Sequence, residues 1–123
     1  MSAAEILIIE DNYFSIQLMA YLLERANYIV KYVFNGEEGL EMLKKSKPDL
    51  IILDIHLPGI DGYKVVKSIK ALPALAKVPL VAVTAMAMVG DREKILNEGF
   101  DFYISKPIQP ETFVKQIEFI LKK

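Results

Sequence analysis

The chain has 123 residues, 53% of them hydrophobic and 25% charged, a composition typical of one globular domain and unlike that of a disordered chain. Its 15 basic and 16 acidic residues give a formal charge of −1, so no basic excess favours nucleic acid or an anionic membrane as a partner. The absence of cysteine excludes disulfides and thiolate chemistry, and the lack of a targeting or membrane-spanning segment leads us to expect a soluble, cytoplasmic protein.

Five short, mostly apolar runs alternate along the chain with longer segments of helical period. Several of these runs are rich in β-branched residues and apolar on both faces, as strands buried between two helix layers are. We expect strands at residues 6–9, 29–33, 50–53, 80–83 and 102–104. Lys31 interrupts the second run, which favours an edge position for that strand.

Helical period fills the segments between the runs. Asn35, with Glu38 three residues later, is expected to cap the second helix, and Asp61 the third. The fourth helix is expected from about residue 86 to residue 97, and Pro110 marks the start of the last. The expected buried positions are Phe14, Leu18, Leu22 and Ala26 in the first helix, Val65, Ile69 and Leu72 in the third, and Phe113, Ile117, Ile120 and Leu121 in the last.

Strict alternation of strands and helices predicts a parallel sheet with helices on both faces. Five such units make an α/β fold of the (βα)5 doubly wound, flavodoxin-like type, with strand order 2-1-3-4-5. We expect this single domain to cover residues 1–123. In sheets of this kind, ligands bind beyond the carboxyl ends of the strands where the order reverses, here between the first and third strands.

Acidic residues stand at that point. Glu10 and Asp11 end the first strand, and Asp54 ends the third. Two unit charges about 4 Å apart repel by roughly 4 kcal/mol at an effective dielectric constant near 20, so this cluster needs a cation or a proton. Oxygen ligands alone suit Mg²⁺. Asp11 and Asn12 are also favoured N-caps, and capping can coexist with metal binding.

The other strand ends supply complementary groups. Thr84 follows the fourth strand and offers a hydroxyl, and Lys106 follows the fifth and offers a positive charge for phosphate. Together with the acids, they suit phosphoryl transfer onto Asp54, with cations neutralising the phosphoryl oxygens.

The segments "EDN" after the first strand, "LDIHLPGIDG" around Asp54, "VTA" at 83–85 and "SKP" at 105–107 stand in this order at the strand ends. With these motifs the chain resembles the receiver domains of two-component response regulators over essentially its whole length. It is similar both to single-domain regulators and to the receivers of hybrid kinases.

The resemblance implies that Asp54 is the phosphoacceptor. It implies that Asp11, Asp54 and the backbone carbonyl of His56 ligate Mg²⁺ directly, and that Glu10 acts mainly through metal-bound water. No other cofactor is implied.

The resemblance also implies that Thr84 and Lys106 contact the phosphoryl oxygens and that Tyr103 is an aromatic switch residue. A cis Lys106–Pro107 bond is expected on the same grounds. The side chains of His56 and Met86 would lie over the phosphorylation pocket, where we expect their bulk to restrict the attacking water and slow hydrolysis.

The resemblance implies a signalling switch rather than an enzyme. This switch would catalyse its own phosphorylation and its own slow dephosphorylation. Its expected donors are a histidine kinase or a histidine phosphotransfer protein, docked near the first helix, where Tyr13 is a candidate contact and Phe14 is read as core. Its expected output is protein binding through the fourth helix, fifth strand and fifth helix, with no output domain, no nucleic acid and no membrane.

The motifs leave one alternative open and argue against two others. A receiver excised from a hybrid kinase would show the same motifs. A flavodoxin-like FMN binder needs a phosphate-cradling loop after the first strand, where this chain has acids. A haloacid-dehalogenase-type phosphatase normally has a second aspartate two residues after its nucleophile, where this chain has His56.

Overall fold

Five parallel strands form one sheet in the order β2-β1-β3-β4-β5 in the computed structural model, which describes residues 3–57, 59–85 and 91–122. The strands are β1 (Glu5–Ile9), β2 (Ile29–Val33), β3 (Leu50–Leu53), β4 (Leu80–Thr84) and β5 (Phe102–Ser105). The predicted fold class and strand order are confirmed. β2, which carries Lys31, lies at the edge of the sheet as expected.

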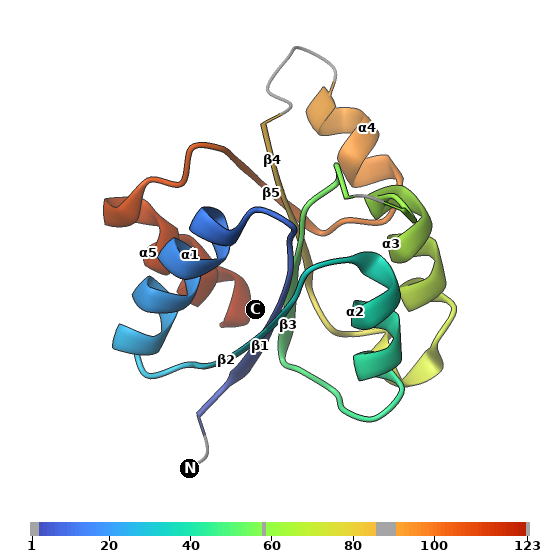
Figure 1. Ribbon diagram of the computed structural model, residues 1–123, viewed down its shortest axis with the longest axis horizontal. Coiled ribbons are helices and arrows are strands. Elements are labelled where there is room, and N and C mark those ends of the chain that lie inside the picture. The colour runs from blue at the N-terminus through green and yellow to red at the C-terminus, as the bar shows by residue number, and fades with distance from the viewer. Residues whose placement is uncertain (1–2, 58, 86–90, 123) are drawn as a thin grey trace.

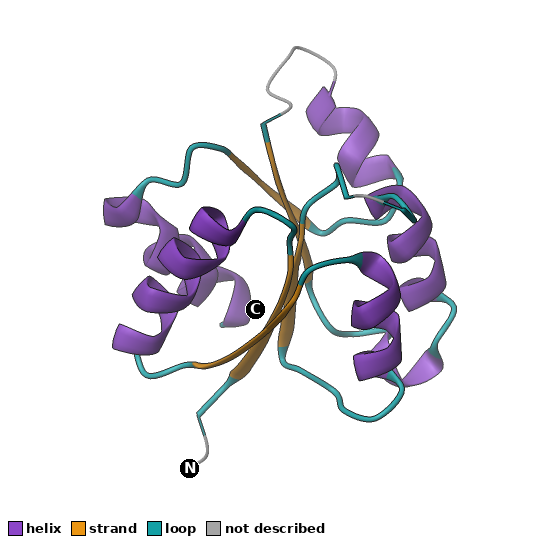
Figure 2. Ribbon diagram, in the orientation of Figure 1, coloured by secondary structure: helices purple, strands orange, loops and turns teal. Residues whose placement is uncertain are grey.

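Helices cover both faces of the sheet. They are α1 (Tyr13–Arg25), α2 (Gly36–Leu43), α3 (Gly62–Lys70), α4 (Asp91–Asn97) and α5 (Pro110–Leu121), with a short 3₁₀ helix η1 (Pro73–Leu75) after α3. Figure 1 shows α1 and α5 on one face, and α2, α3 and α4 on the other; Figure 2 shows the same three layers by secondary structure. Among the described helices, none has the length and apolar character needed to cross a bilayer.

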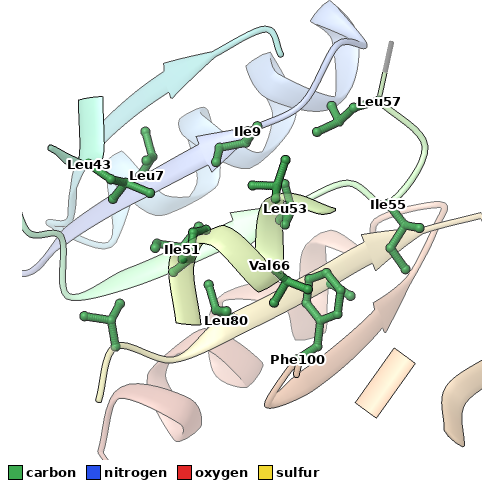
Figure 3. Packing of buried hydrophobic residues seen from close by; sticks show 14 of the residues in the cluster. Leu7, Ile9, Leu43, Ile51, Leu53, Ile55, Leu57, Val66, Leu80 and Phe100 are labelled. Atoms are coloured by element: carbon green, nitrogen blue, oxygen red, sulfur yellow. The ribbon is translucent and has the colours of Figure 1, made fainter. Parts of the chain in front are cut away.

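The two helix layers enclose separate hydrophobic clusters. Alternate residues of a strand point to opposite faces, so Ile6 and Ile8 of β1 pack toward α1 and α5, and Leu7 and Ile9 toward α2 and α3. Figure 3 shows the second cluster, where side chains of β1, β3 and β4 meet α2, α3 and Phe100. All four residues of β3 are fully buried, so the strand is held firmly in the sheet and fixes the position of Asp54, which follows it.

Side-chain caps set where the helices begin. Asn35 Oδ1 accepts the Glu38 backbone N–H at 2.8 Å, and Asp61 Oδ1 accepts the Lys64 backbone N–H at 3.0 Å. Both predicted caps are confirmed. Pro110 is the first residue of α5, also as predicted.

The predicted buried face of the first helix was only partly right: Leu18 and Leu22 are partly buried against the core, but the centre of the buried face lies elsewhere. α1 buries Ile16, Met19, Ala20 and Leu23, whereas Phe14 is 80% exposed. α1 is apolar around most of its circumference, so two stripes satisfy the helical spacing. Packing against β1, β3 and α5 selects the stripe that begins at Ile16.

Two other helix predictions need adjustment. The described part of the fourth helix is the seven-residue α4 (Asp91–Asn97); residues 86–90, including Met86, lie outside the described residues. α3 ends at Lys70, so Leu72 lies beyond it and is only partly buried, followed by η1, which the sequence pattern had not indicated.

Candidate functional site

Backbone pairing of the two central strands brings Glu10 and Asp54 to the same edge of the sheet. Ile9 pairs with Leu53 in register, and the next backbone N–H, that of Asp54, donates to Ile9 O at 3.0 Å. Glu10 continues the ladder on the other side by donating to Val33 O at 3.1 Å. Both side chains are buried, with 1% of Glu10 and 6% of Asp54 exposed.

Asp11 completes a carboxylate cluster. One carboxylate oxygen from each of Glu10, Asp11 and Asp54 lies within 4.8 Å of the other two. Mg²⁺ binds oxygen at about 2.0–2.1 Å, so ligands on opposite sides of the ion stand about 4 Å apart. The all-oxygen donor set and its spacing therefore fit Mg²⁺ after a small contraction.

His56 contributes to this site through its backbone. Its N–H donates to Asp54 Oδ1 at 2.9 Å and so fixes one oxygen of that carboxylate, while the imidazole is exposed. The sequence prediction concerned the His56 backbone carbonyl as a metal ligand; the contact seen here is made by the N–H instead, so the role of the carbonyl stays a prediction.

Lys106 brings a positive charge to the buried acids. Its Nζ lies 2.6 Å from Glu10 Oε1 and 3.3 Å from Asp54 Oδ2. Its backbone N–H donates to Thr84 O at 2.8 Å, and the expected cis Lys106–Pro107 bond is present. Burial acts to lower the pKa of Lys106, but the hydrogen bond to Glu10 and the charge of Asp54 outweigh it and raise that pKa, so the side chain stays cationic.

Glu10 is the most perturbed acid of the site. Burial raises its pKa to about 7, and the neighbouring Asp54 adds to the rise, although Lys106 and the Asn12 N–H oppose it. The Asn12 N–H donates to Oε2 at 2.9 Å. The other oxygen, Oε1, is buried and lies 2.6 Å from Lys106 Nζ. A metal ion beside Oε1 would add a second positive charge to the one that Lys106 supplies.

Thr84 and Tyr103 lie on the neighbouring strands. Thr84 is completely buried at the end of β4, where it pairs in register with Ser105 of β5. Tyr103 is half-buried on β5, packs against the cluster beneath α2, α3 and α4, and lines a cavity of about 490 Å³. Arg92 of α4 and Gln116 of α5 line the same cavity, so Tyr103 lies between these helices.

Sequence reasoning missed two features of the site. It did not find the Lys106–Glu10 ion pair, because strand order places Lys106 at the same edge without specifying which acid it approaches. It also read Phe14 as core, whereas Phe14 lines an open groove of about 400 Å³ together with Leu18, Ile108 and Lys106. Two consecutive aromatic residues at the start of α1 were the available signal.

This arrangement presents a carboxylate with one oxygen held by a backbone N–H and the other facing an ammonium group. The flanking acids concentrate negative charge beside it. Such a site suits attack by Asp54 on an electrophile whose own negative charge is neutralised by Lys106 and a bound cation.

Comparison with known proteins identifies the family of this chain. The model of the response regulator receiver domain family matches residues 6–118. The polar-differentiation response regulator DivK of Brucella anthropi is 40% identical over 116 residues, which are 94% of each chain.

Two solved receiver domains of histidine kinases are also similar. The one from Pseudomonas aeruginosa, described with a magnesium ion coordinated in its active site cleft, has a TM-score of 0.90 and 30% identity over 99% of this chain and 100% of its own. The one from Syntrophus aciditrophicus has a TM-score of 0.88 and 32% identity over 98% and 91% of the two chains. The chain therefore belongs to the receiver domain family of two-component response regulators.

Proposed function

We propose that this receiver accepts a phosphoryl group on Asp54 from a phosphohistidine, carried by a histidine kinase or a histidine phosphotransfer protein. The observation that carries the proposal is the placement of Asp54 Oδ2, 3.3 Å from Lys106 Nζ and beside the carboxylates of Glu10 and Asp11. This edge joins a nucleophile to the charges that a transferring phosphoryl group requires.

In the proposed transfer, a carboxylate oxygen of Asp54 attacks phosphorus and forms the new P–O bond. The P–N bond of the donor breaks, and its electron pair returns to the imidazole nitrogen, which leaves as neutral imidazole when the other ring nitrogen carries a proton. Lys106 neutralises the phosphoryl oxygens, and the Thr84 hydroxyl donates to one of them.

Glu10, Asp11, Asp54 and the His56 carbonyl would hold Mg²⁺ in this proposal. When bound, the ion neutralises the acid cluster and the phosphoryl oxygens. The buried Glu10 Oε1, with its single ion pair, supports an additional cation at this position.

The proposed output is a switch in protein binding rather than turnover of a substrate. A phosphoryl group at Asp54 draws Thr84 toward it, and Tyr103 then moves inward, which biases the face formed by α4, β5 and α5. The cavity lined by Tyr103, Arg92 and Gln116 supports this route, because it gives the tyrosine ring space beside both helices.

The donor is proposed to dock over Phe14 and Tyr13. Phe14 is 80% exposed and lines a groove that Lys106 also lines, so an apolar residue of the donor can be buried there while its phosphohistidine approaches Asp54. Phe14→Ala is expected to slow transfer from a phosphorylated donor protein without slowing phosphorylation by acetyl phosphate. Tyr21→Ala, another exposed aromatic residue of α1, is the matched control. Equal effects with both donors would contradict this docking site.

We also propose that residues 1–123 act as one receiver domain in the cytoplasm. The family match to 6–118 and the 94% coverage shared with a DivK regulator support the single-domain assignment. A receiver belonging to a hybrid kinase remains the alternative, supported by the similar kinase receivers.

Acetyl phosphate and Mg²⁺ provide a direct test. Intact-mass measurement is expected to show one added phosphoryl group on the wild type and none on Asp54→Asn. Glu24→Gln, a change on the exposed side of α1, is the control for altered charge alone. An unmodified wild type, or an equal adduct on Asp54→Asn, would refute the proposed phosphoacceptor.

A further inference from the structure

Tyr63 is a half-buried aromatic residue that the proposed mechanism does not use. It is the second residue of α3, directly after Gly62, so it follows the segment that carries Asp54. Figure 1 shows α3 and α4 on the same face of the sheet. Tyr63 contacts the segment after β3 through its backbone neighbour and α4 through its side chain, as its contacts below show.

The backbone beside Tyr63 is fixed to the phosphorylation site. The Gly62 N–H donates to Ile55 O at 3.0 Å. A Cβ on Gly62 would lie 2.6 Å from the Cα of Ile55 and 2.9 Å from Asp54 O, so the two backbones meet with no room for a side chain. Because closely packed groups transmit displacements, a shift of the Asp54 backbone moves the first turn of α3, and the reverse also holds.

The ring of Tyr63 packs against α4 and the segment that follows it. It meets the buried Phe100 edge to face, with 6.4 Å between the ring centroids and 74° between the ring planes. Lys94 Nζ of α4 lies 5.1 Å from the centroid of the Tyr63 ring, a distance at which a cation is attracted to an aromatic face. These ring contacts stabilise the present position of α4 against α3.

The hydroxyl of Tyr63 acts against these ring contacts. Its oxygen is buried, and no group in the described part of the chain forms a hydrogen bond with it. Burial raises the pKa of Tyr63, and the charges of Glu98, Asp91 and Asp61 raise it further, so the hydroxyl keeps its proton. A buried O–H without an acceptor is unfavourable, because it has lost its hydrogen bonds to water.

Packing alone does not explain a tyrosine at this position. A phenylalanine would keep the ring contacts with Phe100 and Lys94 and would bury no hydroxyl. Asp91 begins α4 and Glu98 directly follows it, so a displacement of α4 changes the distances from the hydroxyl to both carboxylates. Such a displacement can also open the hydroxyl to water. Either change gives the Tyr63 O–H an acceptor.

We propose that the Tyr63 hydroxyl biases α4 toward a second position, in which this hydroxyl gains the acceptor that it lacks in the present one. The ring holds α4 in place, and the hydroxyl lowers the free energy needed to move it. Because the first turn of α3 contacts the Asp54 backbone, Tyr63 is a positioning residue that couples Asp54 to α4. The coupling rests on the proposed function, whereas the bias belongs to the unphosphorylated domain.

Hydrogen–deuterium exchange of the amides of residues 91–99 in the unphosphorylated protein, measured by mass spectrometry, tests the bias. Tyr63→Phe removes only the hydroxyl and is expected to slow this exchange about fivefold, the factor for a buried donor at the low end of its usual cost. Tyr63→Leu also removes the ring contacts and is expected to speed the exchange. Tyr28→Phe is the matched control, because Tyr28 is half-buried in the cluster beneath α1 and α5, and it is expected to leave residues 91–99 unchanged.

Unchanged or faster exchange of residues 91–99 in Tyr63→Phe would overturn the proposal. Equal slowing along the whole chain would also overturn it, because the hydroxyl would then destabilise the entire fold and not the position of α4. With acetyl phosphate and Mg²⁺, the rise in exchange of residues 91–99 is expected to be about twofold smaller in Tyr63→Phe than in the wild type. A wild type that gains no phosphoryl group by intact mass would refute the proposed function, and the result for the unphosphorylated protein would still decide the bias.

Discussion

The buried carboxyl of Glu10 gives the domain a pH-dependent stability. Raising its pKa from 4.5 to about 7 means that the folded protein retains this proton over a range where the unfolded chain has lost it. Because the folded state binds more protons there, stability decreases as pH rises from 4.5 to 7 and is flat above that range. The titration of Glu10 lowers the free energy of unfolding by about 3 kcal/mol in all, of which about 2.5 kcal/mol is lost between pH 5 and pH 8.

Glu10→Gln removes this titration while keeping the size of the side chain. From pH 5 to pH 8, we expect the free energy of unfolding of the variant to rise by about 2.5 kcal/mol relative to that of the wild type. The lost ion pair with Lys106 adds a difference that is the same at both pH values and does not affect this comparison. Urea unfolding followed by circular dichroism, in a metal chelator at both pH values, measures this change. The exposed Glu24→Gln variant controls for the loss of one carboxyl.

Magnesium supplies a second readout of the same group. A bound cation favours ionised Glu10, so adding Mg²⁺ at pH 8 is expected to stabilise the wild type more than Glu10→Gln. Affinity for Mg²⁺ should fall as pH drops below about 7, where Glu10 takes up its proton. A stability difference between wild type and Glu10→Gln that stays constant from pH 5 to pH 8 would refute this account of Glu10.

Three further changes probe the cap, the backbone and the pocket. Asn35→Ala removes the N-cap of α2 and is expected to lower the free energy of unfolding, measured in urea, by about 1 kcal/mol. Phosphorylation by acetyl phosphate is expected to be unchanged, and a slower reaction would contradict this. A Cβ on Gly62 would lie 2.6 Å from the Cα of Ile55, so Gly62→Ala is expected to lower the free energy of unfolding by about 1–3 kcal/mol. Because Ile55 follows Asp54, the variant is also expected to be phosphorylated more slowly by acetyl phosphate. An unchanged rate would show that the backbone moves aside without displacing Asp54. His56→Ala is expected to shorten the lifetime of phosphorylated Asp54 about twofold, because water gains access to the phosphoryl group. This corresponds to a hydrolysis barrier about 0.4 kcal/mol lower. An unchanged lifetime in a phosphate-release assay would show that the His56 side chain does not restrict water.

The fold was predictable because its signals are local and agree with one another. Each buried strand is a short β-branched run, and residues such as Asn35 and Asp61 mark helix starts by hydrogen bonds within the same turn. Glu10 and Asp54 then come together because of the strand order alone, since the parallel neighbours β1 and β3 end at the same edge of the sheet.

Features that depend on tertiary packing were not predictable. Phe14 and Ile16 both lie on helical stripes of α1, and only contact with the sheet determines which stripe is buried. Likewise, the choice of Lys106 between Glu10 and Asp54 depends on a side-chain geometry that motif spacing leaves open.

This choice of Lys106 suggests how the site is prepared for its proposed reaction. Its Nζ is closer to Glu10, at 2.6 Å, than to Asp54, at 3.3 Å, so part of its charge is used to offset the buried Glu10 carboxylate. A cation bound among Glu10, Asp11 and Asp54 would take over that neutralisation. Lys106 would then be available to the phosphoryl oxygens, and the same acid that destabilises the metal-free fold would couple metal binding to phosphorylation of Asp54.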